Sequence, residues 1–567
     1  MTNPDPTVVL PPVTLPELPQ GYHLDNFLTL LDYVTHIYPD LLDNTDLRFV
    51  QCFQGASREA QSLYVRLLMR KGPVFRQDKL HYPDVPDLSG TLQALAADGL
   101  VALDSTTELP LLLNLLRKPE LAQLAGEAGM PRGPQRKETL IQRLLETTEP
   151  DQLHSLLLDI IHWVVRLQDM TVRRLKLLFF GNSRQDFSEF ITTQLGIVRY
   201  EDYPIDHAHR FFQSRDRLCW LEQLTDVLQW WDEHGETAGA DILNHKLTEV
   251  IDIKAQAGDR DTYIADKAAR MITRMARQLE RLSPEQALAA YRHSRYPPSR
   301  ERQARILEKQ GASGAALQLI QTVESTPAHP DEPQSLQALK KKIQKQLAIA
   351  ADVTENLPAD DRITARQLRL NRSDQLIEIQ VAHHLSQQEG NCLALENQLF
   401  CGLFGLFFWD IIFSPRPDAF FNPYQLGPKD LWSEHFYSGR QQAVDERLAL
   451  LNSDDQWQPV LLQHLQEKQG IANYFVNWQV FDQALVERLT AHIPAAHLKQ
   501  VFRKMLEHPG VYRNGFPDLI LLTDNGYHLW EVKGPTDTLQ KNQKRWLTFF
   551  AEHGIPAGVI HVEWLAT

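Results

Sequence analysis

The stretch GFPDLILLTDNGYHLWEVKGP, residues 515–535, sets the fold of the C-terminal part of this chain. Its apolar run 519–522 is typical of a buried strand. Asn525-Gly526 is the strongest short signal for a two-residue β-hairpin turn. Residues 527–532 then form the returning strand, so the stretch predicts a β-hairpin within an α/β domain.

The predicted turn also fixes which residues of the two strands face each other. With Asn525 and Gly526 as the central turn residues, the facing pairs are Asp524 with Tyr527, Ile520 with Glu531 and Asp518 with Lys533. Side chains alternate between the two faces of a strand. Asp518, Glu531 and Lys533 are therefore expected on one face, with neighbouring Cβ atoms roughly 5–8 Å apart.

These three side chains have the composition of a metal-dependent hydrolytic centre. Mg²⁺ and Mn²⁺ prefer carboxylate, carbonyl and water ligands, so Asp518, Glu531 and the backbone carbonyl of Val532 are candidate ligands. A bound cation polarises a phosphoryl oxygen and activates a water molecule, while Lys533 positions that water and offsets the charge that develops on the phosphorane. The alternative is a surface hairpin with a salt bridge. The apolar strands and the flanking prolines favour the metal centre.

Glu396 is the candidate for a further carboxylate ligand. It stands at the start of a predicted helix that runs to Asp410, and it shares a helical stripe with Phe400 and Leu403, which are expected to face inward. A carboxylate on a buried stripe is costly unless it is paired or bound to a metal. The alternatives are that Glu396 caps the helix start, or that Glu389, in a predicted loop, supplies the ligand.

The composition of the chain is that of a multidomain globular protein. Its 567 residues, 43% hydrophobic and 23% charged, predict two to four domains. Four cysteines without CxxC spacing argue against a zinc module or a disulfide framework and suit a reducing cytoplasm. Residues 1–20 lack the charged and apolar parts of a signal peptide. The most apolar run, 399–413, is shorter than a bilayer span, so we expect no membrane partner.

The net charge of −14 opposes nucleic-acid binding, but affinity for DNA depends on local phosphate contacts. Basic clusters occur at 131–145, 166–176 and 340–345. Each cluster alone is compatible with a solvated helix face, whereas their occurrence beside a hydrolytic centre favours phosphate contacts. Arg173 and Arg174 are the candidates in the second cluster.

The chain before residue 236 is predicted to be mostly α-helical. Apolar residues recur at helical spacing in 24–42 and 56–70, and 92–103 predicts a short helix followed by a strand, as in a winged-helix element. Further helices are expected at 153–180 and 186–195.

Residues 116–145 predict a small helix-turn-helix unit. Two segments with apolar faces at helical spacing flank a Gly/Pro-rich turn at 129–134. Arg132, Arg136 and Lys137 are expected at the turn and the start of the second helix, where backbone N–H groups also favour phosphate. The unit resembles a SAP motif, which contacts the backbone of duplex DNA. The alternative is an ordinary helical hairpin.

The region from 236 to 347 is a succession of short amphipathic segments. Tandem helices of this size suggest a TPR-like repeat array. The predicted helices span 238–257, 260–282, 284–293, 300–310, 315–323 and 334–347.

The segment that follows the hairpin predicts a helix that supports the site. Gln540, Gln543 and Trp546 recur at i, i+3 and i+6, so Gln543 is expected to support the active site while Trp546 packs under the sheet. Lys541 and Lys544 on the same helix are candidates for phosphate contacts.

Taken together, these segments resemble the Fanconi-associated nuclease family, whose catalytic part is a VRR-NUC domain of the PD-(D/E)xK nuclease superfamily. The resemblance rests on FPDL at 516–519, EVKGP at 531–535 and FWDIIF at 408–413, with AQSLYVRLLMRKG at 60–72 as further support. It covers nearly the whole chain. The implied division is a helical domain with a winged-helix-like element at 1–107, a SAP-like motif with a helical extension at 108–235, TPR-like repeats at 236–367 and an α/β VRR-NUC domain at 368–567.

The resemblance implies a structure-specific DNA nuclease that uses Mg²⁺ or Mn²⁺. Such an enzyme cuts 5′ flaps near the junction, degrades DNA from 5′ to 3′ and acts on branched or flapped duplexes in interstrand crosslink repair. Carried over residue by residue, Glu396, Asp518, Glu531 and the Val532 carbonyl match metal ligands, and Lys533 matches the catalytic lysine. The cysteines do not form the ubiquitin-binding zinc finger of eukaryotic members, which favours a bacterial, cytoplasmic and nucleoid-associated protein.

Two other functions remain open at this point. A Holliday-junction resolvase works as a symmetric dimer, and the long N-terminal region argues for a monomer instead. A non-catalytic scaffold for branched DNA is disfavoured by the intact set of acids.

Overall fold

The computed structural model describes residues 21–130, 136–185, 198–347, 363–453 and 456–565. The chain forms two compact units. The first holds the described residues between 14 and 195 together with 214–222. The second holds those between 196 and 213 and those from 223 onward. Within the described part, none of the helices combines the length and the apolarity that crossing a membrane requires.

The first unit begins with helices packed on a small sheet. The helices are α1 (Tyr22–Ile37), η1 (Pro39–Leu41), α2 (Asn44–Gly55), α3 (Arg58–Leu68), η2 (Gln77–Lys79) and α4 (Leu88–Ala97). The strands β1 (Val74–Arg76), β2 (Val101–Leu103) and β3 (Trp163–Arg166) form an antiparallel sheet in the order β1-β3-β2. The predicted helix followed by a strand at 92–103 is confirmed by α4 and β2.

The helix predicted at 153–180 is wrong in its middle. The segment divides into α8 (Pro150–Leu158), strand β3 and α9 (Asp169–Phe180). Trp163 and Val164 are fully buried, and β3 pairs with strands on both sides, so tertiary pairing of a Trp-Val-Val run overrides its helical spacing. Strand β3 lies after residue 107, the end of the first predicted segment, and it pairs with β1 and β2, which lie before that residue. The helix predicted at 186–195 lies outside the described residues.

Three helices follow β2 and share one apolar core with α8 and with Val74 and Trp163 of the sheet. They are α5 (Leu109–Leu115), α6 (Lys118–Glu127) and α7 (Lys137–Thr147). Leu121 and Leu124 of α6 pack in one cluster with Leu140 and Leu144 of α7. The two predicted helices of the helix-turn-helix unit are therefore confirmed, while residues 131–135 of the turn lie outside the described residues.

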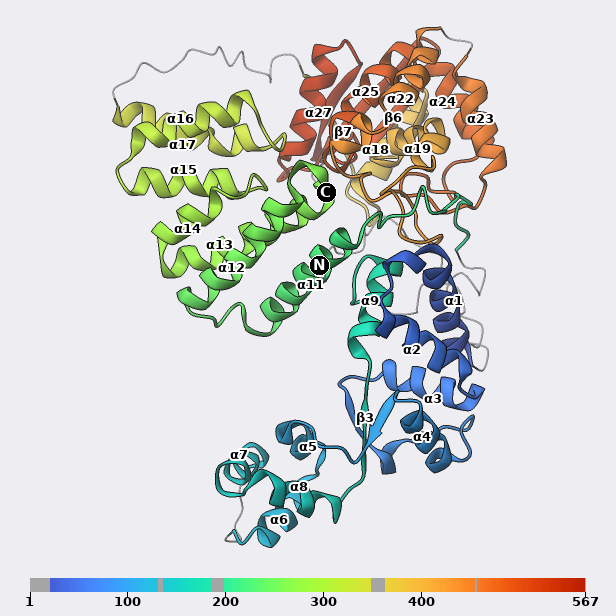
Figure 1. Cartoon of the computed structure of the whole chain (residues 1–567). Coiled ribbons are helices and arrows are strands. Elements are labelled where there is room, and N and C mark those ends of the chain that lie inside the picture. Colours follow the sequence, from blue (N-terminus) through green and yellow to red (C-terminus); the bar gives the residue numbers. More distant parts are fainter. Residues whose placement is uncertain (1–20, 131–135, 186–197, 348–362, 454–455, 566–567) are drawn as a thin grey trace. The chain divides into compact units, whose positions relative to one another are not determined.

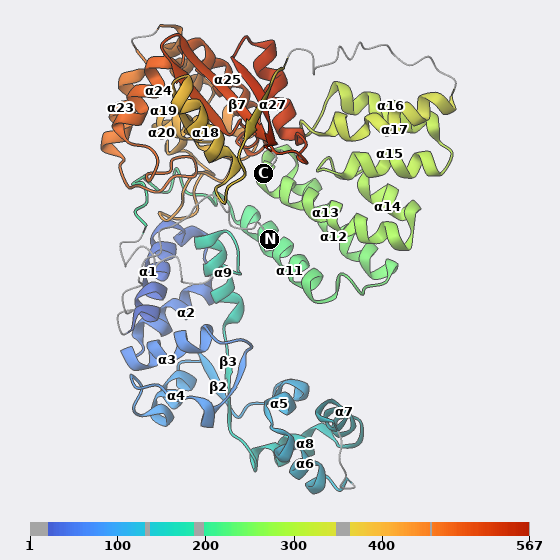
Figure 2. The same ribbon diagram turned by 180° about the vertical axis from the view of Figure 1, so that it is seen from behind.

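The second unit contains an array of helices in its first half (Figures 1 and 2). All the helices predicted between 238 and 347 are confirmed to within two residues at each end. The array consists of α12 (Ala240–Ala257), η3 (Gly258–Arg260), α13 (Thr262–Leu282), α14 (Pro284–Tyr291), α15 (Ser299–Lys309), α16 (Ser313–Ser325) and α17 (Glu332–Gln346). It is preceded by α11 (Arg215–His234), which runs from the first unit into the second.

The second half of this unit is built on a mixed five-stranded sheet. The strands are β4 (Thr364–Leu370), β5 (Asn391–Ala394), β6 (Leu519–Thr523), β7 (Gly526–Lys533) and β8 (Ala557–Trp564). Their order is β4-β8-β7-β6-β5. The β5–β6 and β6–β7 pairs are antiparallel, and the β7–β8 and β4–β8 pairs are parallel. The predicted hairpin is therefore confirmed as β6 and β7.

Helices cover both faces of the sheet. Residues of α18 (Ile377–Gln388) pack on Leu519, Leu521 and Val532, and residues of α27 (Lys541–Glu552) pack with Ile520 and Leu529 on the opposite face. The remaining helices are α19 (Gln398–Phe407), α20 (Trp409–Ile412), α21 (His435–Ser438), α22 (Gln441–Ala449), η5 (Leu450–Asn452), α23 (Gln458–Glu467), α24 (Gln483–His492), α25 (Ala495–Glu507) and α26 (Pro509–Tyr512).

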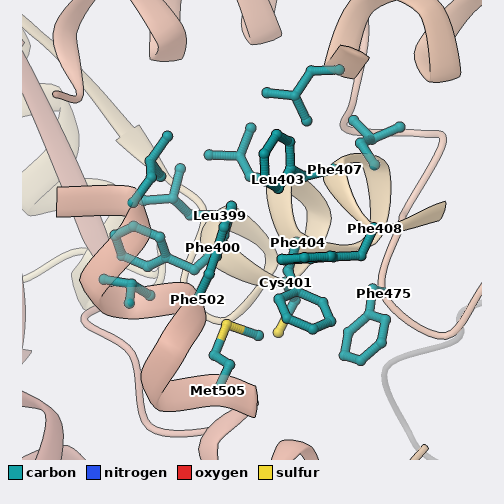
Figure 3. Close-up of a cluster of buried hydrophobic side chains, with 14 of the residues drawn as sticks. Leu399, Phe400, Cys401, Leu403, Phe404, Phe407, Phe408, Phe475, Phe502 and Met505 are labelled. Atoms are coloured by element: carbon teal, nitrogen blue, oxygen red, sulfur yellow. The ribbon is translucent and has the colours of Figure 1, made fainter. Parts of the chain in front are cut away.

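Helix α19 is the centre of the largest apolar cluster in this half (Figure 3). All of its residues except Gln398 are buried. The ring of Phe404 lies 5.0 Å from that of Phe475 and 5.7 Å from that of Phe502 of α25. A Cβ atom at Gly402 would lie 2.1 Å from the ring of Phe481, so glycine allows this close approach. The predicted helix with Phe400 and Leu403 facing inward is thus confirmed from Gln398 to Phe407.

Candidate metal centre

The hairpin register differs from the predicted one by two residues. Thr523 faces Gly526 and Leu519 faces Trp530, so the turn is Asp524-Asn525 and the next pair along the ladder is Asp518 with Glu531. The prediction that Asp518 faces Lys533 is wrong. A shift of two residues leaves every side chain on its predicted face, because the side-chain period of a strand is two.

The packing of the sheet confirms that the three charged residues share a face. Ile520 and Leu529 belong to the core on the α27 side, and Leu519 and Trp530 belong to the core on the α18 side. By alternation along each strand, Asp518, Glu531 and Lys533 lie on the α27 side.

Main-chain hydrogen bonds fix the position of Asp518. The backbone N–H of Val532 donates to its Oδ2 at 2.8 Å. Its own carbonyl accepts from the N–H groups of Leu395 and Glu396, at 3.1 and 3.0 Å. Asp518 is therefore attached to both neighbouring strands, and the backbone of Glu396 is held beside it.

Glu531 and Lys533 form a buried ion pair. Glu531 is 1% exposed and Lys533 is 8% exposed, and the Lys533 Nζ lies 2.8 Å from the Glu531 Oε1. Apart from this ion pair, neither oxygen of Glu531 has a hydrogen-bonding partner among the described residues. A buried carboxylate with free acceptor capacity is costly, and a cation would satisfy it.

The two carboxyl groups hold their protons more tightly than free side chains do. Burial raises the pKa of Asp518 from 3.8 to about 6, against the opposing effect of the Val532 amide. Burial, followed by the charge of Asp518, raises the pKa of Glu531 from 4.5 to about 7, while Lys533 opposes the shift. Carboxyl groups with raised pKa values are typical of sites that bind a cation or transfer protons.

Glu396 lies beside the site but not on the buried stripe that was predicted. It is exposed, occupies the turn between β5 and α19, and has a φ of 44°. The prediction is wrong because α19 begins only at Gln398, so Glu396 does not share its inward face. Its carboxylate accepts a hydrogen bond from the Asn397 side chain at 2.8 Å. Its charge contributes to raising the pKa of both Asp518 and Glu531.

Asn397 and Glu378 are residues that the sequence patterns did not single out. The Oδ1 of Asn397 accepts from the N–H groups of Gly515 and Phe516, at 2.8 and 3.2 Å, and so positions the segment that leads to Asp518. Glu378, in the first turn of α18, has a charge that raises the pKa of Asp518. The sequence pattern that could have pointed to Glu378 is the helical spacing of the apolar residues in α18. The alternative ligand Glu389 instead pairs with Arg366 at 2.6 Å.

Helix α27 supports the loop before Asp518. The fully buried Trp546 stacks on Phe516 with ring centroids 4.2 Å apart, and its Nε1–H donates to the carbonyl of Asn514 at 3.2 Å. The prediction that Trp546 packs under the sheet is confirmed. Gln543 accepts from the backbone N–H of Gln540 at 2.9 Å, so in this structure it caps the start of the helix.

The predicted phosphate-binding cations differ in whether their side chains are exposed or already bonded within the protein. Lys541, Lys544 and Arg136 are exposed, and within the described part of the chain no ion pair engages the two lysines. Lys137 donates to the carbonyls of Asn114 and Leu116, both at 2.8 Å, and therefore closes the end of α5. Arg132 lies outside the described residues.

Arg174, a candidate phosphate contact, forms ion pairs with three acids of the first unit. It pairs with Asp43 at 2.6 Å, Asp46 at 2.8 Å and Glu222 at 2.6 Å, and its side chain is 16% exposed. Its neighbour Arg173 donates to the carbonyl of Glu222 at 3.4 Å. The local sequence did not reveal these pairs because their partners are distant in the chain.

The donor set fits a hard divalent cation. Asp518 and Glu531 supply carboxylate oxygens, Glu531 has unused acceptor capacity, and Val532 lies between the two charged residues of β7. Such oxygen donors suit Mg²⁺ and Mn²⁺. As they stand, no three His, Cys, Asp or Glu side chains of the described ranges lie close enough together to enclose an ion, and the Glu396 carboxylate accepts its hydrogen bond from Asn397.

Comparisons with known proteins identify both parts of the chain. A family profile described as "VRR-NUC domain" matches residues 452–564, which include the hairpin, and one described as "FAN1, HTH domain" matches residues 21–102. The helical N-terminal region with a helix-turn-helix domain is thus followed by a mixed α/β VRR-NUC region.

Relatives and solved structures match over nearly the full length. A "Fanconi-associated nuclease 1 homolog" of Pseudomonas aeruginosa is 32% identical over 98% of both chains. The human "Fanconi-associated nuclease 1" is 24% identical, and the match covers 95% of this chain and 62% of the human protein. The crystal structure of "paFAN1 bound to 2nt 5'flap DNA with gap" superposes with a TM-score of 0.80 and 31% identity, over 97% of this chain and 100% of that one. This chain therefore belongs to the Fanconi-associated nuclease family.

Proposed function

We propose that this protein is a metal-dependent, structure-specific DNA nuclease that cuts 5′ flaps near the junction. It also degrades DNA from 5′ to 3′ and acts in the repair of interstrand crosslinks. The observation that carries the proposal is the half-buried Asp518 facing the buried Glu531, with Lys533 at 2.8 Å from Glu531. The similarity to a structure that holds 5′-flap DNA supports the substrate class.

The residues of the centre have separate roles. Asp518, Glu531 and the carbonyl of Val532 would hold Mg²⁺ or Mn²⁺, and Glu396 would be a further ligand. When bound, the cation polarises the scissile phosphate and lowers the pKa of a water molecule. Lys533 would position the attacking water by a hydrogen bond and would offset the negative charge that grows on the phosphoryl oxygens.

The rest of the chain presents the DNA. Lys541 and Lys544 of α27 are exposed beside the catalytic sheet and contact phosphates near the scissile bond, and Gln543 supports them by capping the helix. Arg132 and Arg136 of the SAP-like motif contact a duplex arm. Lys137, Arg173 and Arg174 act indirectly, because their bonds to neighbouring carbonyls and acids stabilise the local structure. The division into segments 1–107, 108–235, 236–367 and 368–567, with TPR-like repeats and a PD-(D/E)xK catalytic fold, is part of this proposal.

The test is cleavage of an end-labelled 5′-flap duplex in Mg²⁺ or Mn²⁺. Wild type is compared with Glu531→Gln and with Asp524→Asn, which changes an exposed carboxylate in the turn of the same hairpin. We expect incision near the junction by wild type and by Asp524→Asn only.

The same assay separates the other functions. Symmetric cutting of a four-way junction in preference to the flap would favour a resolvase. An absence of metal-dependent cutting on every branched substrate, with binding retained, would favour a scaffold. Either result contradicts the flap-nuclease proposal.

A further inference from the structure

Helix α13 carries a row of cations on one side. Its apolar side chains, among them Ile264, Ile272 and Leu279, are buried against the array. The opposite side presents five basic residues at intervals of three and four positions, which places them on one face of a helix. This cationic face consists of Lys267, Arg270, Arg274, Arg277 and Arg281.

The cationic face contains no acidic residue. At 100° per residue, its five cations fall within a sector of roughly 80°, and Tyr263 is the other α13 residue in that sector. All four of its arginines are exposed. In a chain with a net charge of −14, such a uniform cationic row is a local reversal of the overall charge.

Neighbouring acids neutralise little of this face. Asp232 of α11 lies 3.8 Å from Arg274, a distance at which an exposed pair contributes little. Glu280 of α13 is engaged by Arg302 and by the hydroxyl of Tyr291. Asp266 lies at the edge of the face and outside the sector.

Aromatic rings under the cations hold several of them in place. The guanidinium of Arg270 lies 5.1 Å from the ring centre of Tyr296, and that of Arg274 lies 5.2 Å from that of Trp231. The ammonium of Lys267 lies 5.2 Å from the ring centre of Tyr263. A cation stacked on a ring keeps its charge and its remaining N–H donors available while it loses conformational freedom.

The length of the row suits a duplex. From Lys267 to Arg281 the helix rises about 21 Å at 1.5 Å per residue, which corresponds to roughly six base pairs at 3.4 Å each. Among the described residues, no acid hydrogen-bonds to these guanidinium groups, and their regular spacing matches a regular row of phosphates. They provide no means to read base edges.

We propose that the cationic face of α13 is a binding surface for the phosphate backbone of a duplex DNA arm. This inference rests on the proposed function, because it takes DNA as the substrate, and it adds a contact in the helical array to those of the catalytic sheet and the SAP-like motif. The surface sets affinity and orientation and is insensitive to sequence.

The test is the salt dependence of binding, measured by fluorescence anisotropy with a 5′-flap duplex in EDTA, so that no cutting occurs. The variant is Arg270→Gln with Arg277→Gln. The slope of log K against log salt is negative, and each lost phosphate contact reduces its magnitude by about 0.9. We expect the magnitude of the slope to decrease by about 2 and the affinity to fall roughly tenfold at 0.1 M salt.

The matched control is Arg292→Gln with Lys309→Gln, which removes the same charge from exposed positions outside α13 in the same array. We expect this control to retain the wild-type slope. An equal decrease in both variants would show a general effect of net charge and overturn the inference. An unchanged slope in the α13 variant would also overturn it and leave the face for an acidic protein partner.

A second comparison separates this inference from the proposed function. Duplex arms are shortened one at a time, and we expect one arm whose shortening weakens wild type but not the α13 variant. If wild type binds no flap substrate at all, the proposed function fails first. If wild type binds and cuts while the α13 variant matches it on every substrate, only the α13 surface is contradicted.

Discussion

The centre on β7 and the cationic face of α13 present charge in opposite ways. Glu531 and Lys533 are buried at the end of a strand and pair with each other. The arginines of α13 are exposed and share their face with no acid. Buried charges depend on each position around them, so a single substitution removes their function. Exposed charges act additively through a screened field, so their loss is gradual and depends on salt.

The largest expected effect is on the buried side of this comparison. Asp518→Asn keeps the shape and the hydrogen bond from Val532 but removes the charge that faces Glu531. We expect flap cutting in Mn²⁺ to fall by about 10²- to 10³-fold, measured as single-turnover rates. Asp524→Asn, in the turn of the same hairpin, should retain the wild-type rate. A rate within a factor of three of wild type for Asp518→Asn contradicts the assignment of the centre.

Arg174 tests whether a partly buried, ion-paired cation in the first unit acts in folding or in binding. Arg174→Gln leaves Asp46, whose side chain is 0% exposed, without its counter-charge. Breaking such a pair costs about 3 kcal/mol in the free energy of unfolding, measured by urea denaturation. The exposed Arg136→Gln serves as the control and should stay within about 0.5 kcal/mol of wild type. Unchanged stability with weakened DNA binding would return Arg174 to the phosphate contacts first predicted.

The raised pKa values of the centre predict a pH-dependent metal affinity. With pKa values near 6 and 7, Asp518 and Glu531 are partly protonated at pH 6 and ionised at pH 8, and metal binding must displace those protons. We expect the Kd for Mn²⁺, measured by calorimetry, to fall by about tenfold or more between pH 6 and pH 8. Because Asp518→Asn removes one of the titrating ligands, it should flatten this dependence, whereas Asp524→Asn should not.

The raised pKa values of Asp518 and Glu531 also predict how the stability of the metal-free protein changes with pH. The folded state holds these protons more tightly than the unfolded state, so the stability that they contribute is complete below about pH 4 and is lost as pH rises through 7. Addition of Mn²⁺ should therefore raise the Tm more at pH 8 than at pH 6. An equal rise at both values would show that the two carboxylates are not the ligands.

The smallest effect is expected on the exposed side, at the start of α27. Lys541→Gln with Lys544→Gln should weaken flap binding roughly tenfold at 0.1 M salt and lower the salt slope by about 2. The unfolding free energy should change by less than about 0.5 kcal/mol. The Arg292→Gln and Lys309→Gln pair again controls for charge. A loss of stability in place of affinity would show that the two lysines serve the helix.

The sequence was sufficient for features that depend on local patterns. The helical array was located because its apolar residues repeat along each helix, and the hairpin because a turn signal separates two apolar strands. The register was wrong by two residues, yet Asp518 and Glu531 stayed on the predicted face because the strand period is two.

Features that depend on distant partners were not predictable in this way. The sequence of strand β3 has helical spacing, and only its pairing with β1 and β2 makes it a strand. Arg174 pairs with Asp46 and Asp43, which lie 128 and 131 positions away in the sequence. The exposure of Glu396 follows from the exact start of α19, and helix boundaries are the least certain part of a sequence pattern.

The position of β8 has a consequence for synthesis of the enzyme on the ribosome. This strand is the latest of the five in the chain, yet it lies between β4, the earliest, and β7, which carries Glu531 and Lys533. Until residues 557–564 have been translated and have left the exit tunnel, β4 has no partner in the sheet and one edge of β7 stays open. The nascent chain can complete its helical units first, so the surfaces proposed to bind DNA form before the centre proposed to cut it.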